Sequence, residues 1–151
     1  MKLTPASRWL LMATLSLLYA SGLLWLVLHY ALATPRPFGP PQHAWEPGVL
    51  ALHGLLGMAG LVAIGAMLPL HARSGWLQRR NRTLGMMLLT LGLWAAVTGW
   101  GLYYAGGEAL RAWLPWLHWV PLLPAPLVLV LHRAAARRPQ GLAEEFLSGS
   151  K

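Results

Sequence analysis

The chain contains four long apolar stretches, and each is long enough to cross a lipid bilayer as a helix. We expect spans at residues 9–33, 48–70, 84–105 and 113–133, because about 20 apolar residues match the hydrocarbon thickness. With 56% hydrophobic and 11% charged residues, the chain has too few polar side chains to coat a soluble protein of its size. Short connections make successive helices antiparallel neighbours. The sequence therefore predicts an all-α transmembrane four-helix bundle, a single domain over residues 1–151 with a basic tail at 134–151.

Basic residues are distributed unevenly over the predicted connections and tails. Arg36 and Arg111 fall on one side of the predicted bundle, and all the other basic residues fall on the opposite side. By the positive-inside rule both termini are cytoplasmic, and we expect a multi-pass protein of the bacterial inner membrane. The first span is too long for the apolar region of a secretory signal, so we expect it to be retained. The basic residues on the cytoplasmic side are Lys2, Arg8, Arg73, Arg79, Arg80, Arg82, Arg133, Arg137, Arg138 and Lys151.

The net charge and the missing residue types exclude several classes of function. Because the arginines flank spans, the formal net charge of +8 reports topology and contact with membrane lipid, and no nucleic acid is expected as a partner. The absence of cysteine excludes disulfides, thiolate zinc sites, iron–sulfur clusters and covalently attached c-type haem. With four glutamates as the only acids, carboxylate-bridged metals are poorly supported. A redox cofactor would be held without a covalent bond, by histidine or less favourably by methionine.

Four histidines lie inside two of the predicted spans: His53 and His71 in the second, His118 and His132 in the fourth. An imidazole at membrane depth is costly unless it is coordinated or hydrogen-bonded, so the repeated pairs favour a ligand, and we expect haem iron. Fourteen residues of helix rise about 21 Å and eighteen rise about 27 Å, and both spacings keep the paired histidines close to one helix face.

The topology predicts which histidines pair. The second and fourth spans run in the same direction, so His53 lies level with His118 on the outer side and His71 level with His132 on the inner side. The two rises differ by about 6 Å, which tilt and distortion at the prolines of the two spans must absorb. The alternative reading for each ring is a polar contact within the bundle or at the headgroups. His29 is an alternative outer ligand, although an interfacial role is favoured for it, and His43 is expected to be solvated.

The chain resembles the small four-helix di-haem b-type cytochromes of membranes. This group includes the cytochrome b subunits of formate dehydrogenase and nickel–iron hydrogenase and the bacterial superoxide oxidase. The resemblance covers most of the chain and rests on residues 52–57 (LHGLLG), on residues 98–104 (TGWGLYY) and on the gap between His118 and His132. It implies bis-His haems near the two membrane faces. In several members one further ligand comes from the first helix, but residues 7–18 contain no histidine here, which leaves His71 as the substitute.

Glycines and arginines complete the predicted cofactor sites. Gly57 and Gly60 follow His53 by one and two turns and would let a flat porphyrin approach. Close helix packing is the favoured reason for any single glycine, and both roles can hold together. Arg111 on the outer side and Arg73 on the inner side are candidate partners for haem propionates. Their alternative role is contact with lipid headgroups.

The function expected from these features is electron transfer across the membrane through two non-covalent b-type haems, with quinone or a redox protein as partner. Bis-His ligation leaves no open iron position, which disfavours oxygenase and peroxidase chemistry. One alternative is a direct redox enzyme such as a superoxide:quinone oxidoreductase, for which Arg36, His43 and Arg111 would attract anions. The other is a haem-free structural or assembly subunit. A larger complex and a homo-oligomer are both compatible with the sequence.

Overall fold

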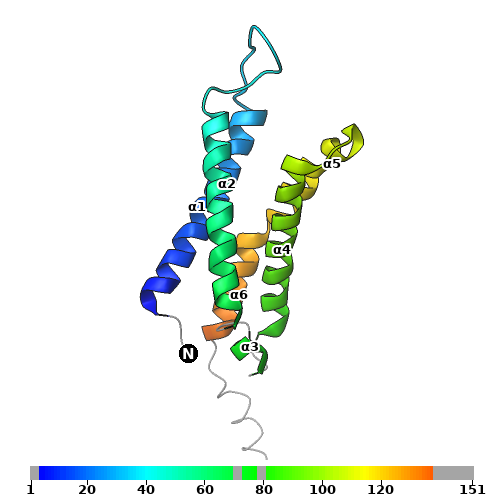
Figure 1. Cartoon of the computed structure of the whole chain (residues 1–151). Coiled ribbons are helices and arrows are strands. Elements are labelled where there is room, and N and C mark those ends of the chain that lie inside the picture. Colours follow the sequence, from blue (N-terminus) through cyan, green and yellow to red (C-terminus); the bar gives the residue numbers. More distant parts are fainter. Residues whose placement is uncertain (1–3, 70–72, 78–80, 138–151) are drawn as a thin grey trace, which may run out of the picture. The chain divides into compact units, whose positions relative to one another are not determined.

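The computed structural model describes residues 4–69, 73–77 and 81–137 (Figure 1). Every regular element in these ranges is helical, which confirms the all-α class. Four helical segments of the described chain are long and apolar enough to cross a membrane: Pro5–Tyr30, Glu46–Met67, Arg82–Tyr104 and Glu108–Ala136. The chain thus has the organisation of a multi-pass membrane protein. The elements are α1 (Pro5–Tyr30), α2 (Glu46–Met67), α3 (Arg73–Leu77), α4 (Arg82–Tyr104), α5 (Glu108–Trp119), the 3₁₀ helix η2 (Val120–Leu122) and α6 (Ala125–Arg137).

The chain divides into two compact units, Met1–Arg73 and Ser74–Lys151. The first unit contains the helices α1 and α2, and the second contains α4, α5, η2 and α6. The single domain, the packing of the four spans into one bundle and the cytoplasmic termini expected from the sequence remain predictions.

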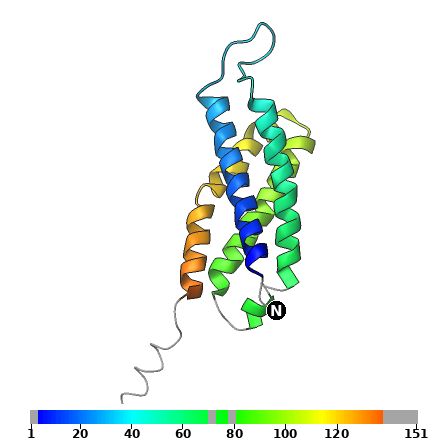
Figure 2. The same ribbon diagram turned by 90° about the vertical axis from the view of Figure 1, so that its left-hand side faces the viewer.

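Helices α1 and α2 form an antiparallel hairpin, as Figures 1 and 2 show. The helices approach closely at Gly60, where a Cβ atom would lie 3.5 Å from a methyl group of Leu18 on α1. Leu28 is buried in the same unit, with 4% of its surface exposed. Gly60 on α2 has no side chain beyond hydrogen, so Leu18 of α1 can pack against its backbone. Close contacts at small residues are usual between membrane helices.

In the second unit, α4 packs against both α5 and α6. Leu114 of α5 lies against Gly101 of α4, where a Cβ atom would be only 3.2 Å from Leu114 Cδ2. Leu114 and Val128 of α6 are each 7% exposed and are the buried apolar side chains among the described residues of this unit. Helix α4 is therefore the element that both halves of the last span share.

The last span is broken in the middle, whereas the sequence led us to expect one helix over residues 113–133. Helix α5 ends at Trp119, a 3₁₀ turn follows, and α6 begins at Ala125. Proline lacks an N–H group, so Pro121 leaves the carbonyl of Leu117 without its helical partner. The indole Nε1–H of Trp94 on α4 donates to this carbonyl at 2.6 Å. A neighbouring helix thus satisfies the backbone group that the proline releases.

We expect Trp94→Phe to destabilise the second unit, because the Leu117 carbonyl loses its donor while the aromatic ring is largely kept. The loss should be about 1 kcal/mol, the usual net value of one hydrogen bond. Thermal unfolding in detergent, followed by circular dichroism, measures it. Trp100→Phe is the matched control, since Trp100 lies on the same helix and is 66% exposed. Equal melting temperatures for the two variants would contradict this assignment of Trp94.

Candidate functional site

The structure places three of the four predicted ligand histidines on three different helices. His53 lies on α2 in the first unit, and His118 and His132 lie on α5 and α6 in the second. All three rings are partly buried. His71 lies outside the described residues, so its predicted role stays a prediction.

His53 is held by the helix opposite to it in the hairpin. Its Nδ1 atom lies 3.0 Å from Ser21 Oγ and 3.1 Å from the carbonyl oxygen of Leu18, both on α1. The Ser21 hydroxyl donates its own proton to the Leu18 carbonyl at 2.9 Å. Both partners therefore act as acceptors toward the ring, so the proton is on Nδ1. In this neutral tautomer Nε2 carries the lone pair that can bind a metal.

His118 has the same arrangement in the second unit. Its Nδ1 atom lies 2.9 Å from Thr98 Oγ1 on α4. The Thr98 hydroxyl donates to the carbonyl of Trp94 at 2.6 Å, so its oxygen accepts from the ring. This places the proton on Nδ1 of His118 as well. The two rings share one tautomer, and in each case a hydroxyl-bearing residue of the neighbouring helix selects it.

A glycine follows each of these hydroxyl residues and gives the imidazole room. A Cβ atom at Gly22 would lie 3.0 Å from His53 Cε1, and one at Gly99 would lie 3.3 Å from His118 Cε1. Both distances are shorter than ordinary van der Waals contact. The pairs Ser21-Gly22 and Thr98-Gly99 therefore make the same local arrangement. The first residue hydrogen-bonds the ring nitrogen, and the second, which lacks a Cβ atom, leaves space for the ring.

His132 is held differently. The side-chain amide nitrogen of Asn81 lies 3.0 Å from His132 Nδ1 and also donates to the His132 carbonyl oxygen at 2.8 Å. Because an amide N–H group is a donor, Nδ1 is here an acceptor and the neutral ring carries its proton on Nε2. This is the opposite tautomer to the one in His53 and His118. The glycine opposite the ring, Gly85, is also less crowded, with a Cβ distance of 3.6 Å.

The remaining predicted site residues have roles that packing or exposure explains. Gly57 and Gly60 face Leu18, at Cβ distances of 4.0 and 3.5 Å, so helix packing accounts for them, and the porphyrin contact stays a prediction. Arg111 on α5 and Arg73 at the start of α3 are exposed. The contact of these two arginines with haem propionates likewise stays a prediction.

The sequence analysis missed the residues that hold the rings. Ser21 and Thr98 are separated from their histidines by 32 and 20 residues, so no local pattern links them. One signal was present, since a hydroxyl residue followed by glycine occurs in the first span and again in the TGWGLYY segment. Among the described residues, no group of three or more His, Cys, Asp or Glu side chains is arranged to hold a metal ion. Comparison of the chain with protein-family models, curated proteins and solved structures gave no match.

We expect Thr98→Val to shift His118 toward the tautomer with the proton on Nε2, because the valine keeps the shape of threonine but removes the acceptor. A bond of about 1 kcal/mol corresponds to a change of about fivefold in the tautomer ratio. Ser21→Ala should have a smaller effect on His53, since the Leu18 carbonyl still accepts. The ¹⁵N chemical shifts of labelled imidazole rings measure both ratios.

Thr14→Val is the control for this experiment, because the Thr14 hydroxyl donates to Leu10 of its own helix. It should leave both rings unchanged. A tautomer ratio for His118 that is the same in Thr98→Val and in the wild-type protein would refute the role of Thr98.

Proposed function

We propose that the protein is a membrane b-type cytochrome that carries electrons across the bilayer through two non-covalent haems. His53 and His118 are the axial ligands of one haem, and His71 and His132 those of the other. A haem iron with two axial imidazoles accepts and releases one electron at a time without an open coordination position. Quinone is the proposed electron-exchange partner in the membrane.

The observation that carries the proposal is the shared tautomer of His53 and His118. A histidine that binds a metal through Nε2 generally donates its Nδ1–H to a carbonyl or another oxygen, which fixes the ring and raises its basicity. Ser21 and the Leu18 carbonyl do this for His53, and Thr98 does it for His118. The repetition of this arrangement on two separate helix pairs supports the assignment of both rings as ligands.

The residues around the rings fit a redox cofactor in two further respects. Apolar helices on a membrane-spanning chain exclude water from the ligand nitrogens and thereby strengthen coordination. Gly22 and Gly99 let each imidazole lie against the backbone of the neighbouring helix, which restricts its rotation. Both rings are thus oriented by the protein before any ligand binds, and preorganisation of this kind reduces the free-energy cost of binding.

The proposed inner site differs chemically from the outer one. For His132 to ligate through Nε2, its proton must move to Nδ1, and Asn81 must then present its amide oxygen to the ring. That change costs the bond from the Asn81 amide to the His132 carbonyl. We therefore expect the inner haem to bind more weakly than the outer haem.

A haem-free structural or assembly subunit is the second candidate function. The Asn81 contact favours it for the α4–α6 pair, because it uses His132 as an ordinary link between helices. In this reading the histidines only stabilise helix pairs. A reduced-minus-oxidised absorption spectrum of the purified protein decides between the candidates, since only the cytochrome has haem bands.

We expect two haems per chain, both extractable with acid–acetone and both of the b type by pyridine haemochrome analysis. His53→Ala and His118→Ala should each remove the same spectral component, because a bis-His site loses its six-coordinate spectrum with either ligand. His132→Ala should remove the other component. Losses in which His53→Ala matches His132→Ala would refute the pairing, and protein without haem would refute the function.

We also expect Gly22→Ala to lower the occupancy of the haem bound by His53. The new methyl group would meet His53 Cε1 at 3.0 Å, so the ring must move away from Ser21. The haem-to-protein ratio after titration with haemin measures the effect, and a loss of roughly 10-fold in affinity is typical when the partner of a ligand histidine is disturbed. Gly65→Ala is the control, since no atom lies within 4 Å of a Cβ at that position. Equal haem affinities in the two variants would exclude this role for Gly22.

A further inference from the structure

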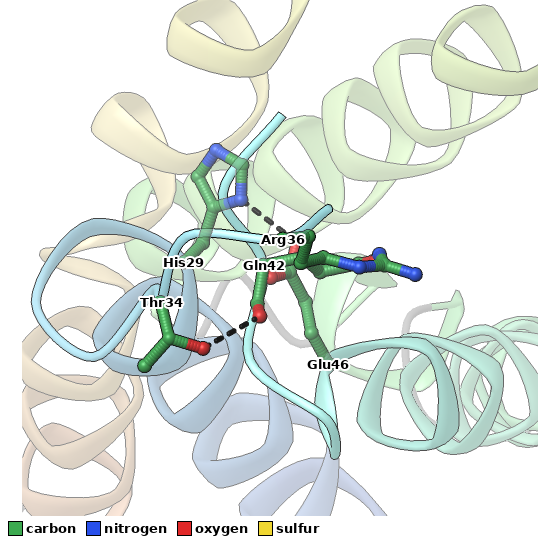
Figure 3. A network of polar contacts seen from close by, with 5 residues as sticks. All are labelled: His29, Thr34, Arg36, Gln42 and Glu46. Atoms are coloured by element: carbon green, nitrogen blue, oxygen red, sulfur yellow. Dashed lines mark hydrogen bonds and ion pairs between the residues drawn. The ribbon is translucent and has the colours of Figure 1, made fainter. Parts of the chain in front are cut away.

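A glutamate and a histidine meet at the end of the α1–α2 hairpin where the helices are connected. His29 in the last turn of α1 lies with Nδ1 2.8 Å from Oε1 of Glu46, the first residue of α2, and Figure 3 shows the two side chains directed toward each other. The connecting loop is closed beside them by Thr34 and Gln42, whose backbones are bonded at 3.0 Å. Arg36 adds a side-chain hydrogen bond to Gln42. The His29–Glu46 pair thus lies beside a connecting loop that is closed by hydrogen bonds of its own.

The Glu46 side chain is almost completely buried, whereas His29 reaches the surface. Their side chains are 7% and 39% exposed, respectively. Among the described residues, Glu46 Oε2 has no hydrogen-bond partner, although it is inaccessible to solvent. A buried carboxylate oxygen is costly unless a donor or a proton satisfies it. Oε2 is therefore a position at which an O–H donor from a ligand would be stabilised.

A second unsatisfied group belongs to a residue that stacks on the same imidazole. Trp25 stacks on His29, with ring centroids 4.6 Å apart and planes inclined by 12°. Its indole Nε1 atom is also buried, and no described residue accepts a hydrogen bond from it. One acceptor and one donor of the protein thus lack partners on residues that contact His29. A quinol supplies both complements, because a hydroxyl group can donate to Glu46 Oε2 and a hydroxyl oxygen can accept from the indole of Trp25.

The pair lies close to the proposed haem ligand of the same hairpin. Glu46 precedes His53 by seven residues, which is about 10.5 Å of rise and within about 20° of two whole turns. Glu46 and His53 therefore share the face of α2 that packs on α1. A molecule bound at Glu46 would have its proton acceptor and the route to its electron acceptor on one helix face.

We propose that His29 and Glu46 form the proton-accepting site for a quinol at this end of the hairpin. This inference rests on the proposed cytochrome function, which supplies the oxidant. A quinol that becomes a quinone loses two electrons and two protons. The two proposed haems, when bound, would each accept one of the electrons. One proton passes from a quinol hydroxyl to Glu46 Oε2, and the other leaves directly to water. The Nδ1–H group of His29 donates to Oε1 and holds the carboxylate in position, and Glu46 then releases its proton to water beside the exposed part of that ring.

The test is the anaerobic reduction of the haems by a short-chain ubiquinol in stopped flow, in wild-type protein and in Glu46→Gln. Glutamine keeps the size of the side chain and an oxygen for His29 but cannot take up a proton. We expect a fall of about 100-fold in the maximal rate, within the usual range for loss of a general base. The haem spectrum and reduction by dithionite should be unchanged. Glu108→Gln is the matched control, because Glu108 is also in the first turn of a helix but is exposed.

Glu46→Asp gives a second measurement in case glutamine impairs folding. The shorter carboxylate should retain a rate between those of the wild-type protein and Glu46→Gln. Wild-type rates in Glu46→Gln, or in both variants, would overturn the proposal while leaving the cytochrome function intact. Absence of haem from the wild-type protein would instead refute the function on which the proposal rests.

Photolabelling with an azido-ubiquinone locates the site without using the haems. We expect ubiquinone-sensitive labels on the tryptic peptide of residues 9–73, which contains both Trp25 and Glu46 because trypsin does not cleave the bond between Arg36 and Pro37. The label on this peptide should decrease in Trp25→Phe, because that variant removes the indole donor to a quinone carbonyl. Competed labels found solely in the second unit would refute a site at this end of the hairpin.

Discussion

An imidazole between apolar helices must find acceptors for its N–H group, and the rest of the structure depends on how this chain meets that requirement. Water is absent from the hydrocarbon region, so the partner has to come from an adjacent helix. Ser21 and Thr98 are suited to this because each hydroxyl donates to a carbonyl of its own helix and keeps its oxygen for the ring. The position of the histidine, the tautomer of its ring and the contact between two helices are thus set by one interaction.

The same requirement explains the break in the last span. Pro121 in η2 cannot donate to the Leu117 carbonyl of α5, and Trp94 on α4 supplies that donor. Trp94 also offers its backbone carbonyl to Thr98, which holds His118. The repair of the helix and the orientation of the imidazole therefore share a residue. A substitution at Trp94 would remove the donor to the Leu117 carbonyl, whereas the backbone carbonyl that Thr98 uses would remain.

The apolar runs predicted the four spans because length and hydropathy are local properties of the sequence. The partners of the histidines were not predictable in this way, since Ser21 and His53 are 32 residues apart and meet only when the hairpin forms. The prolines of the last span were visible, but the compensating donor lies on another helix. The sequence alone shows Glu46 only as one of four acids, because its burial depends on the packing of α1 against α2. The sequence thus predicted the elements, whereas the polar contacts required the fold.

The interruption between α5 and α6 makes the directions of His118 and His132 independent of each other. In a continuous helix, fourteen residues fix the angle between two side chains, and any rotation of one moves the other. Here a 3₁₀ turn and Pro124 separate the two segments, and each segment has its own contact to α4. The interruption therefore separates the orientation of α5 from that of α6. The surroundings of one histidine are therefore free to change, in evolution or by design, without altering the setting of the other.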